Sequence, residues 1–176
     1  MKAMSISEAL KYVKKQLQPK INDALTHEVL DAVADAQRQT IYDVVYSRPT
    51  KRYERRMDEG GLSDMEHNLI FDSSAVKYGV LYVENITPPN RFLNGVNGDM
   101  GYSSTPFDET ITRLIEYGIY NSRGYGYDYW PDAKAAPFIA GTRRAIATGV
   151  TPGGHSVTTA VTALKKGLKR NGVSTL

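Results

Sequence analysis

The sequence predicts an α+β fold, in which a long N-terminal helix packs on a small antiparallel β-sheet. Two observations carry this prediction. Apolar residues recur at helical spacing over residues 21–44, and between residues 67 and 86 apolar and polar residues alternate as they do in strands. We also expect further short helices and an amphipathic C-terminal helix.

The length of 176 residues suits one domain with an appended arm. We place the domain at residues 1–148, with a long loop inserted at 87–108, and a linker with a C-terminal helical arm at 149–176. The chain has no cysteine, which excludes disulfides, thiolate nucleophiles and cysteine-ligated metals. The N-terminus lacks the apolar core of a secretory signal, and no apolar run approaches the ~18 residues of a membrane span. We therefore expect no membrane partner.

The first predicted helix begins at Ser5 or Ser7, because Glu8 follows Ser5 at the spacing of a capping box. Its apolar residues recur at helical spacing; they are Ile6, Leu10, Val13 and Leu17. Pro19 suits the first turn of a second helix, which we expect to run to Tyr46 and to end before Pro49. This second helix either lies on the sheet or also packs on a neighbouring subunit.

Two segments after this helix read as strands. Residues 67–73 form the first and residues 75–86 the second, in which Val76, Tyr78 and Val80 alternate with other residues. Ser73 and Ser74 would form the hairpin turn between them. A two-stranded hairpin is therefore expected.

The charges before this hairpin are arranged in blocks. Residues 48–56 carry five basic residues, including Arg52, Arg55 and Arg56, against one acid, and the next ten residues carry four acids and no base. Such a run is commonly a solvated face. Alternatively, a positive block beside a negative one sets the register between identical subunits.

A segment without regular pattern follows at 87–108, rich in proline and glycine. A loop this long in a small domain is usually functional or disordered. It contains Phe92, Leu93 and Tyr102. We interpret it either as a contact loop that orders on assembly or as a floppy insertion.

Aromatic residues gather in the next segment. Six of them lie between Tyr117 and Trp130, among them Tyr125 and Tyr127. Tyrosine and tryptophan are enriched at protein interfaces, so we expect a subunit contact here, with core packing as the alternative. Base stacking is disfavoured, because Arg123 is the only cation in the segment.

The C-terminal part is basic. Residues 133–176 hold seven basic residues and no acid, whereas the first 132 residues have a net charge of −4. A helix is expected from Pro137 to Gly149, and another from Ser156 to Asn171 whose apolar stripe is Val157, Val161, Leu164 and Leu168. The latter helix docks on its own domain or on a neighbour. Its basic residues, which we expect at an acidic surface, are Lys165, Lys166, Lys169 and Arg170.

No catalytic or metal-binding pattern stands out. The three histidines are far apart in the sequence, and no phosphate-binding loop or nucleophile elbow occurs. Glu109 and Glu116 are a weak candidate for an acid/base pair. We expect no enzymatic activity and no cofactor.

Three short motifs occur in order: Gly61-Leu62, then Glu116-Tyr117-Gly118, then Pro137-Phe138. In this order and spacing, the chain resembles the head–tail joining proteins of tailed bacteriophages, the neck or tail-completion group that includes minor tail protein Z-like members. The resemblance covers residues 20–148. The chain departs from the usual pattern of these proteins at two places. It has Gly60-Gly61-Leu62-Ser63 where they usually have Thr-Gly-x-Leu, and Ile119 where they usually have threonine or serine.

This resemblance implies a structural virion protein that forms a homo-oligomeric ring of six or twelve copies. The ring would join the head connector or adaptor to the tail tube or tail terminator, with DNA passing through its lumen without sequence recognition. Assembly would take place in the cytoplasm of the host bacterium. The alternative is a nucleic-acid-binding protein that uses its basic C-terminal segment.

Overall fold

The computed structural model describes residues 5–48, 60–87, 116 and 136–174 of the chain. The fold is mostly helical with one small two-stranded antiparallel sheet, so the predicted α+β class is confirmed. A long helical segment at the N-terminus runs through four elements without a break. They are α1 (Ile6–Ala24), the π-helical turn η1 (Leu25–Val29), α2 (Leu30–Ile41) and the π-helical turn η2 (Tyr42–Tyr46).

The start of α1 agrees with the sequence. The Ser5 hydroxyl accepts a hydrogen bond from the Glu8 amide at 3.3 Å, and a Glu8 carboxylate oxygen accepts one from the Ser5 amide at 2.9 Å. This reciprocal pair is a capping box, which satisfies two amides that the first turn of a helix leaves free.

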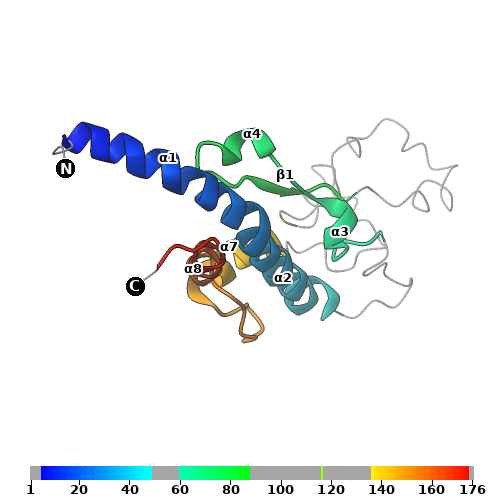
Figure 1. Ribbon diagram of the computed structural model, residues 1–176. Coiled ribbons are helices and arrows are strands. Elements are labelled where there is room, and N and C mark those ends of the chain that lie inside the picture. Colours follow the sequence, from blue (N-terminus) through cyan, green and yellow to red (C-terminus); the bar gives the residue numbers. More distant parts are fainter. Residues whose placement is uncertain (1–4, 49–59, 88–115, 117–135, 175–176) are drawn as a thin grey trace, which may run out of the picture.

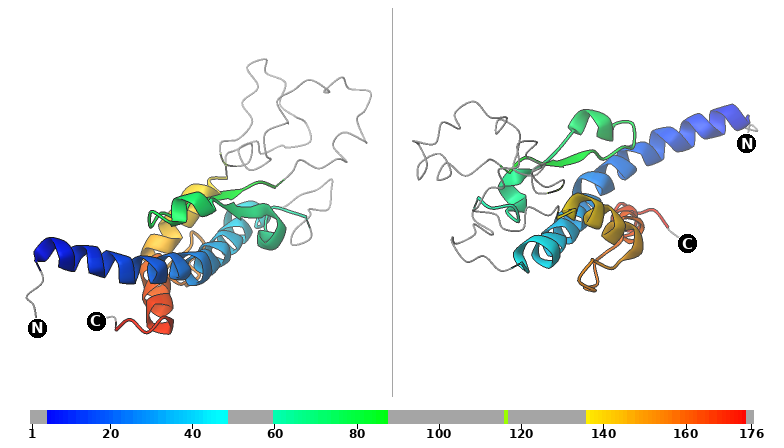
Figure 2. Two further views of the ribbon diagram at one scale, coloured as in Figure 1. Left: turned by 45° about the horizontal axis from the view of Figure 1, so that its top comes forward. Right: turned by 180° about the vertical axis from the view of Figure 1, so that it is seen from behind.

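The expected helix boundary at Pro19 is wrong, because α1 passes through this residue. A proline inside a helix removes one backbone hydrogen bond and crowds the carbonyl one turn earlier. Pro19 is exposed, so water can hydrate that carbonyl, and the helix continues. The helical segment changes direction further on, between α1 and α2 at η1, as both Figure 1 and Figure 2 show.

The sheet is shorter than predicted. Strand β1 (Leu69–Phe71) follows the helical turn α3 (Met65–Asn68) and pairs with β2 (Val83–Asn85). The second strand was expected from residue 75, but a helical turn, α4 (Ser73–Val76), takes its first part. The Asp72 carboxylate accepts a hydrogen bond from the Ser74 amide at 2.7 Å, which favours this helical turn over the tight hairpin turn predicted at Ser73 and Ser74.

The C-terminal part holds helices α7 (Phe138–Thr148) and α8 (Ala160–Arg170). As expected, α7 ends at Gly149, whose φ of 83° is left-handed. The expected start of the last helix at Ser156 is wrong, since Ser156 pairs with Val150 in an isolated β-bridge and Thr159 caps α8 instead. The division into a domain at 1–148 and an arm at 149–176 stays a prediction.

Helix α8 lies across α1 and η1 of its own chain, and the expected stripe contributes only in part, through Leu164, which packs against the cluster of Val29, Ala32 and Ala163. Val161 of that stripe is 65% exposed, and Leu164 and Leu168 are half-buried. The buried residues of α8 are Ala163 and Gly167. Small side chains let the two helix backbones approach closely, so contact distance, rather than apolar volume, selected the buried face.

Two hydrophobic clusters form the core. The larger joins the end of the N-terminal helical segment to α7 and to the segment before α3; its buried members are Ile41, Val45, Leu62, Met65, Ala136 and Phe138. The smaller joins η1 and α2 to α8 through Val29, Ala32 and Ala163. In all the views of Figures 1 and 2, the N-terminal half of α1 projects beyond the other helices and strands that the structure describes.

Candidate assembly interface

Two of the three short motifs contribute to the larger cluster, and the described residue of the third, Glu116, binds the start of α7 beside it. Leu62 is 4% exposed and Phe138 is fully buried, and both belong to that cluster. Glu116 is 6% exposed, and its carboxylate accepts hydrogen bonds from the Ile139 amide at 2.7 Å and the Ala140 amide at 3.1 Å. A carboxylate at this place satisfies the free amides of the α7 N-terminus and matches its positive dipole end. Glu116 therefore fixes the start of α7.

Pro137, which is exposed, precedes this helix as its N-cap residue and makes no side-chain cap. The capping oxygen therefore comes from Glu116, far away in the sequence. Tyr117 and Gly118 lie outside the described residues, as does Glu109. The suggested acid/base role of Glu116 has no geometric support, since both carboxylate oxygens bind backbone amides.

Gly61 and Leu62 are held by amide side chains. The Asn68 amide donates to the Gly61 carbonyl at 2.7 Å, and the Asn85 amide donates to the Leu62 carbonyl at 3.1 Å. Both asparagines are buried, where an unsatisfied amide is costly. These bonds tie the segment before α3 to the ends of the hairpin strands, so this motif is structural.

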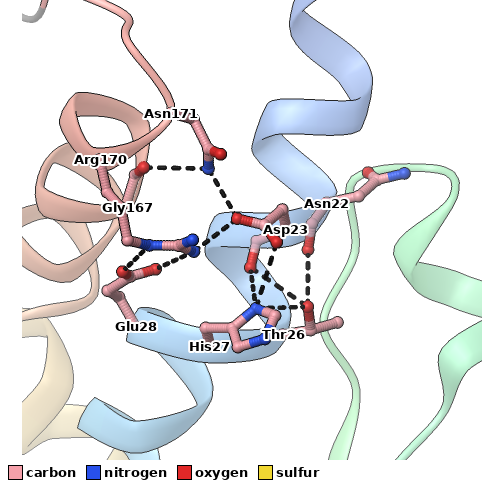
Figure 3. Close-up of polar contacts among 8 residues, drawn as sticks. All are labelled: Asn22, Asp23, Thr26, His27, Glu28, Gly167, Arg170 and Asn171. Carbon is pink, nitrogen blue, oxygen red and sulfur yellow. Dashed lines mark hydrogen bonds and ion pairs between the residues drawn. The ribbon is translucent and has the colours of Figure 1, made fainter.

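A polar clamp fastens α8 to the bend of the N-terminal helical segment (Figure 3). The Arg170 guanidinium binds Glu28 and Asp23, each at 2.5 Å, and the Asn171 amide donates to Asp23 at 2.7 Å. Hydrogen bonds from Arg170 lower the pKa of Glu28, and those from Asn171 and Arg170 lower the pKa of Asp23. Of the four basic residues predicted at an interface, Arg170 is therefore bound within its own chain.

A second polar cluster surrounds Asp43 of η2, whose side chain is 4% exposed. Its carboxylate accepts hydrogen bonds from the Thr151 hydroxyl, from the Gly153 amide at 2.9 Å and from Gln39 at 3.1 Å, and lies 3.0 Å from His155. Burial opposes ionisation of Asp43, but these donors outweigh it and lower its pKa. The cluster holds the loop between α7 and α8 against η2.

The projecting half of α1 carries an apolar row on its surface, which we call the α1 stripe: Ile6, Leu10, Val13 and Leu17. The first three are 82%, 65% and 47% exposed, and Leu17 is half-buried. Lys11, Lys14 and Lys15 are exposed on the same half. The sequence indicated this row as a helical face but gave no sign that the body of the chain leaves it uncovered.

The β-hairpin carries a second exposed apolar set. Ile70 is 44% exposed and Tyr82 is 60% exposed. Ile70 pairs with Glu84, so these two side chains share one face of the sheet, and Asp72 and Tyr82 follow two residues along on the same face. We call Ile70, Asp72, Tyr82 and Glu84 the outer hairpin face.

Many of the predicted interface residues lie outside the described part of the chain. They are Arg52, Arg55, Arg56, Phe92, Leu93, Tyr102, Tyr125, Tyr127 and Trp130. On α8, Lys165, Lys166 and Lys169 are exposed. Their proposed contacts with other subunits stay predictions.

Among the described residues, no group of three His, Cys, Asp or Glu side chains could hold a metal ion. None of the helices described is both long and apolar enough to cross a membrane. An open cleft of about 600 Å³ lies between α2 and residues 156–158, and it is lined by Asp35, Arg38, Gln39 and Tyr42 together with Ser156, Val157 and Thr158. Asp35 and Arg38 there pair with each other at 3.5 Å, so this cleft presents no convergent acid and base.

Comparison with known proteins gives one match. Residues 9–170 match the family model described as YomN, which spans every helix and strand described above except the first three residues of α1. No curated protein and no solved structure matches the chain.

Proposed function

The chain belongs to the YomN family, whose name is phage-derived, and from this premise we propose that it is a structural virion protein forming a ring at the head–tail junction. In this proposal the ring joins the head connector to the tail and lets DNA pass. Its mechanism is self-association together with docking of the rings above and below, without catalysis. In this role it completes the tail or neck.

The observation that carries this proposal is the uncovered α1 stripe. The first turns of α1 project beyond the other elements that the structure describes, and isolated helices of this length are weakly stable in water. Three large apolar side chains at 82%, 65% and 47% exposure indicate a surface that an assembly covers. Burying them would contribute roughly 1.5–3 kcal/mol each as an upper bound.

The motif positions support the same proposal. Leu62, Glu116 and Phe138 build the core and the start of α7 rather than a reactive centre. Residues that serve packing are compatible with a scaffold. The resemblance of these motifs to head–tail joining proteins supports a place at the head–tail junction.

The test is an image of the protein in an intact particle. We expect density for the fold as a ring between connector and tail, and a location elsewhere would overturn the proposal. Particles that lack the protein should separate into filled heads and free tails. Leu10→Asp should fail to restore joining, whereas Val161→Asp, at a position that is also 65% exposed but lies on α8, should restore it.

A second candidate is nucleic-acid binding through the exposed Lys165, Lys166 and Lys169 of α8. It predicts an affinity for DNA that falls steeply with salt. The internal pairing of Arg170 weakens this candidate, because that cation is already neutralised. Weak DNA binding at physiological salt by a protein that joins heads to tails would exclude it.

A further inference from the structure

The projecting half of α1 is apolar on one side and basic around it. The α1 stripe spans residues 6–17, about 18 Å of helix. Over residues 5–20 the chain has four lysines and one glutamate, and Glu8 is engaged with Ser5 in the capping box. A partner for this surface must therefore be apolar and acidic.

The same chain carries such a surface at the outer hairpin face. Ile70 and Tyr82 supply exposed apolar area, and Asp72 and Glu84 supply two carboxylates. The Asp72 carboxylate also accepts the hydrogen bond from the Ser74 amide, and Lys77 lies close enough to offset part of its charge, so Glu84 carries most of the acidic character of this face. The tip beside it adds Tyr78 at 76% and Val80 at 55% exposure. The chain thus has two exposed apolar surfaces of opposite charge.

These two surfaces do not cover each other within one chain. The hairpin tip approaches α1 further along, where Gly79 faces Gln18, while Ile6, Leu10 and Val13 stay exposed. Figures 1 and 2 show the N-terminal half of α1 leading away from the hairpin. Mutual coverage consequently requires a second molecule.

We propose that the α1 stripe of one copy docks on the outer hairpin face of the next copy. Because the two surfaces differ, the contact is heterologous, and a pair of copies keeps one free α1 stripe and one free outer hairpin face. Repetition of such a contact closes a ring when the rotation between copies allows it. The inference deepens the proposed function, on which it rests only for closure of the ring at the head–tail junction.

Pairing of two α1 helices with each other is the first competing arrangement. The spacing of Ile6, Leu10, Val13 and Leu17 is that of a coiled-coil seam, but it lasts for fewer than the three or four heptads that such a pair needs. Lys11, Lys14 and Lys15 would also face a second set of lysines, and like charges at an interface are unfavourable. Charge complementarity therefore favours the hairpin.

The absence of cysteine from the natural chain allows a direct mapping of the contact. Leu10→Cys protein is mixed with Tyr82→Cys protein and oxidised at high concentration. We expect a disulfide between the two variants at least about tenfold above that of Leu10→Cys mixed with Val161→Cys, since position 161 is as exposed as position 10. Cross-linking no better than this control would overturn the proposal, as would Leu10→Cys linking mainly to itself.

Charge reversal gives a second, independent test. Lys14→Glu with Lys15→Glu should weaken self-association at least about tenfold in sedimentation, because close charge pairs across an interface are strongly coupled. Adding Glu84→Lys should restore it at least in part, whereas Lys166→Glu on α8 should change nothing. Loss of self-association without rescue contradicts the hairpin as the partner. If the natural protein does not self-associate but binds anionic vesicles, α1 is assigned to a lipid surface instead.

The two proposals fail in different ways. If the cross-link forms but the protein lies away from the head–tail junction, the proposed function fails and the contact stands. If the protein forms a ring at the junction in particles where positions 10 and 82 do not cross-link, the contact fails and the proposed function stands.

Discussion

At the scale of single residues, buried carboxylates hold together parts of the chain that are distant in sequence. Glu116 binds two amides of α7, 23 and 24 residues away, and Asp43 binds a loop more than 100 residues away. The two side chains carry negative charge at places that water barely reaches, and backbone or hydroxyl donors compensate for the lost hydration. Such residues are sensitive to neutral replacement.

Replacing Glu116 by glutamine should destabilise the fold. The amide keeps the size of the side chain but turns one acceptor into a donor that faces a backbone N–H, and it removes the charge at the helix N-terminus. We expect a loss of about 1–2 kcal/mol in the free energy of unfolding, measured by urea denaturation. Glu66→Gln, at an exposed residue of α3, is the control and should change stability by less than about 0.5 kcal/mol.

The Asp43 cluster predicts a dependence of stability on pH. The folded-state pKa of Asp43 lies below the usual aspartate value of 3.8, so its contribution is present above that value and is lost as the pH falls through the folded-state pKa. Asp43→Asn should therefore cost about 1–3 kcal/mol at pH 7. The difference between the variant and the natural protein should shrink below pH 4, as followed by urea denaturation at several pH values.

The matched control is Asp35→Asn, because Asp35 lies on the preceding helix, α2, with a side chain that is 74% exposed. Its effect should be small and nearly independent of pH. An Asp43→Asn protein as stable as the natural one at pH 7 would show that the loop after α7 does not depend on this carboxylate.

At the scale of elements, tertiary packing determined which local structure formed wherever the sequence signals were ambiguous. The capping box of α1 and the glycine at the end of α7 were predictable, because each is a local pattern whose partners lie within a few residues. The strand expected from residue 75 was not, since the alternation of Val76, Tyr78 and Val80 also suits an exposed turn once Asp72 caps it. Pro19 likewise did not start a new helix, because an exposed proline can be accommodated inside α1.

The face of α8 is the clearest case. Its sequence pointed to Val161, which is exposed, and the buried face contains Gly167 instead. A methyl group added at Gly167 would lie 2.5 Å from the Ala24 side chain and 2.9 Å from its Cα. Single-sequence patterns report apolar volume and carry no information on the distance of a partner backbone, so this contact could not be predicted.

Gly167→Ala should accordingly destabilise the contact between α8 and α1. An alanine raises helix propensity by about 1 kcal/mol, but forcing a methyl into this contact costs typically 1–3 kcal/mol. We expect net destabilisation and faster amide hydrogen exchange over α8. Val161→Ala tests the propensity term alone, because that residue is exposed on the same helix, and it should be neutral or slightly stabilising.

At the scale of the whole molecule, the chain separates what it needs for folding from what it shows to a partner. The core lies where α2, α7 and the segment before α3 meet, and α8 closes over the bend at η1. The N-terminal half of α1 lies outside this body. The candidate site could be foreseen only in part: the sequence showed the row from Ile6 to Leu17, but only the fold shows that the row is uncovered.

This separation predicts that changes in the α1 stripe leave the fold intact. Leu10→Ser with Val13→Ser should alter the free energy of unfolding of the isolated chain by no more than about 0.5 kcal/mol, because these side chains are exposed there. Ile41→Ala, at a fully buried residue of the core, should cost about 2–5 kcal/mol. Urea denaturation at low concentration, where chains do not associate, measures both. If the serine pair destabilised the chain as much as Ile41→Ala, the stripe would belong to the fold itself, and its exposure would offer no surface for assembly.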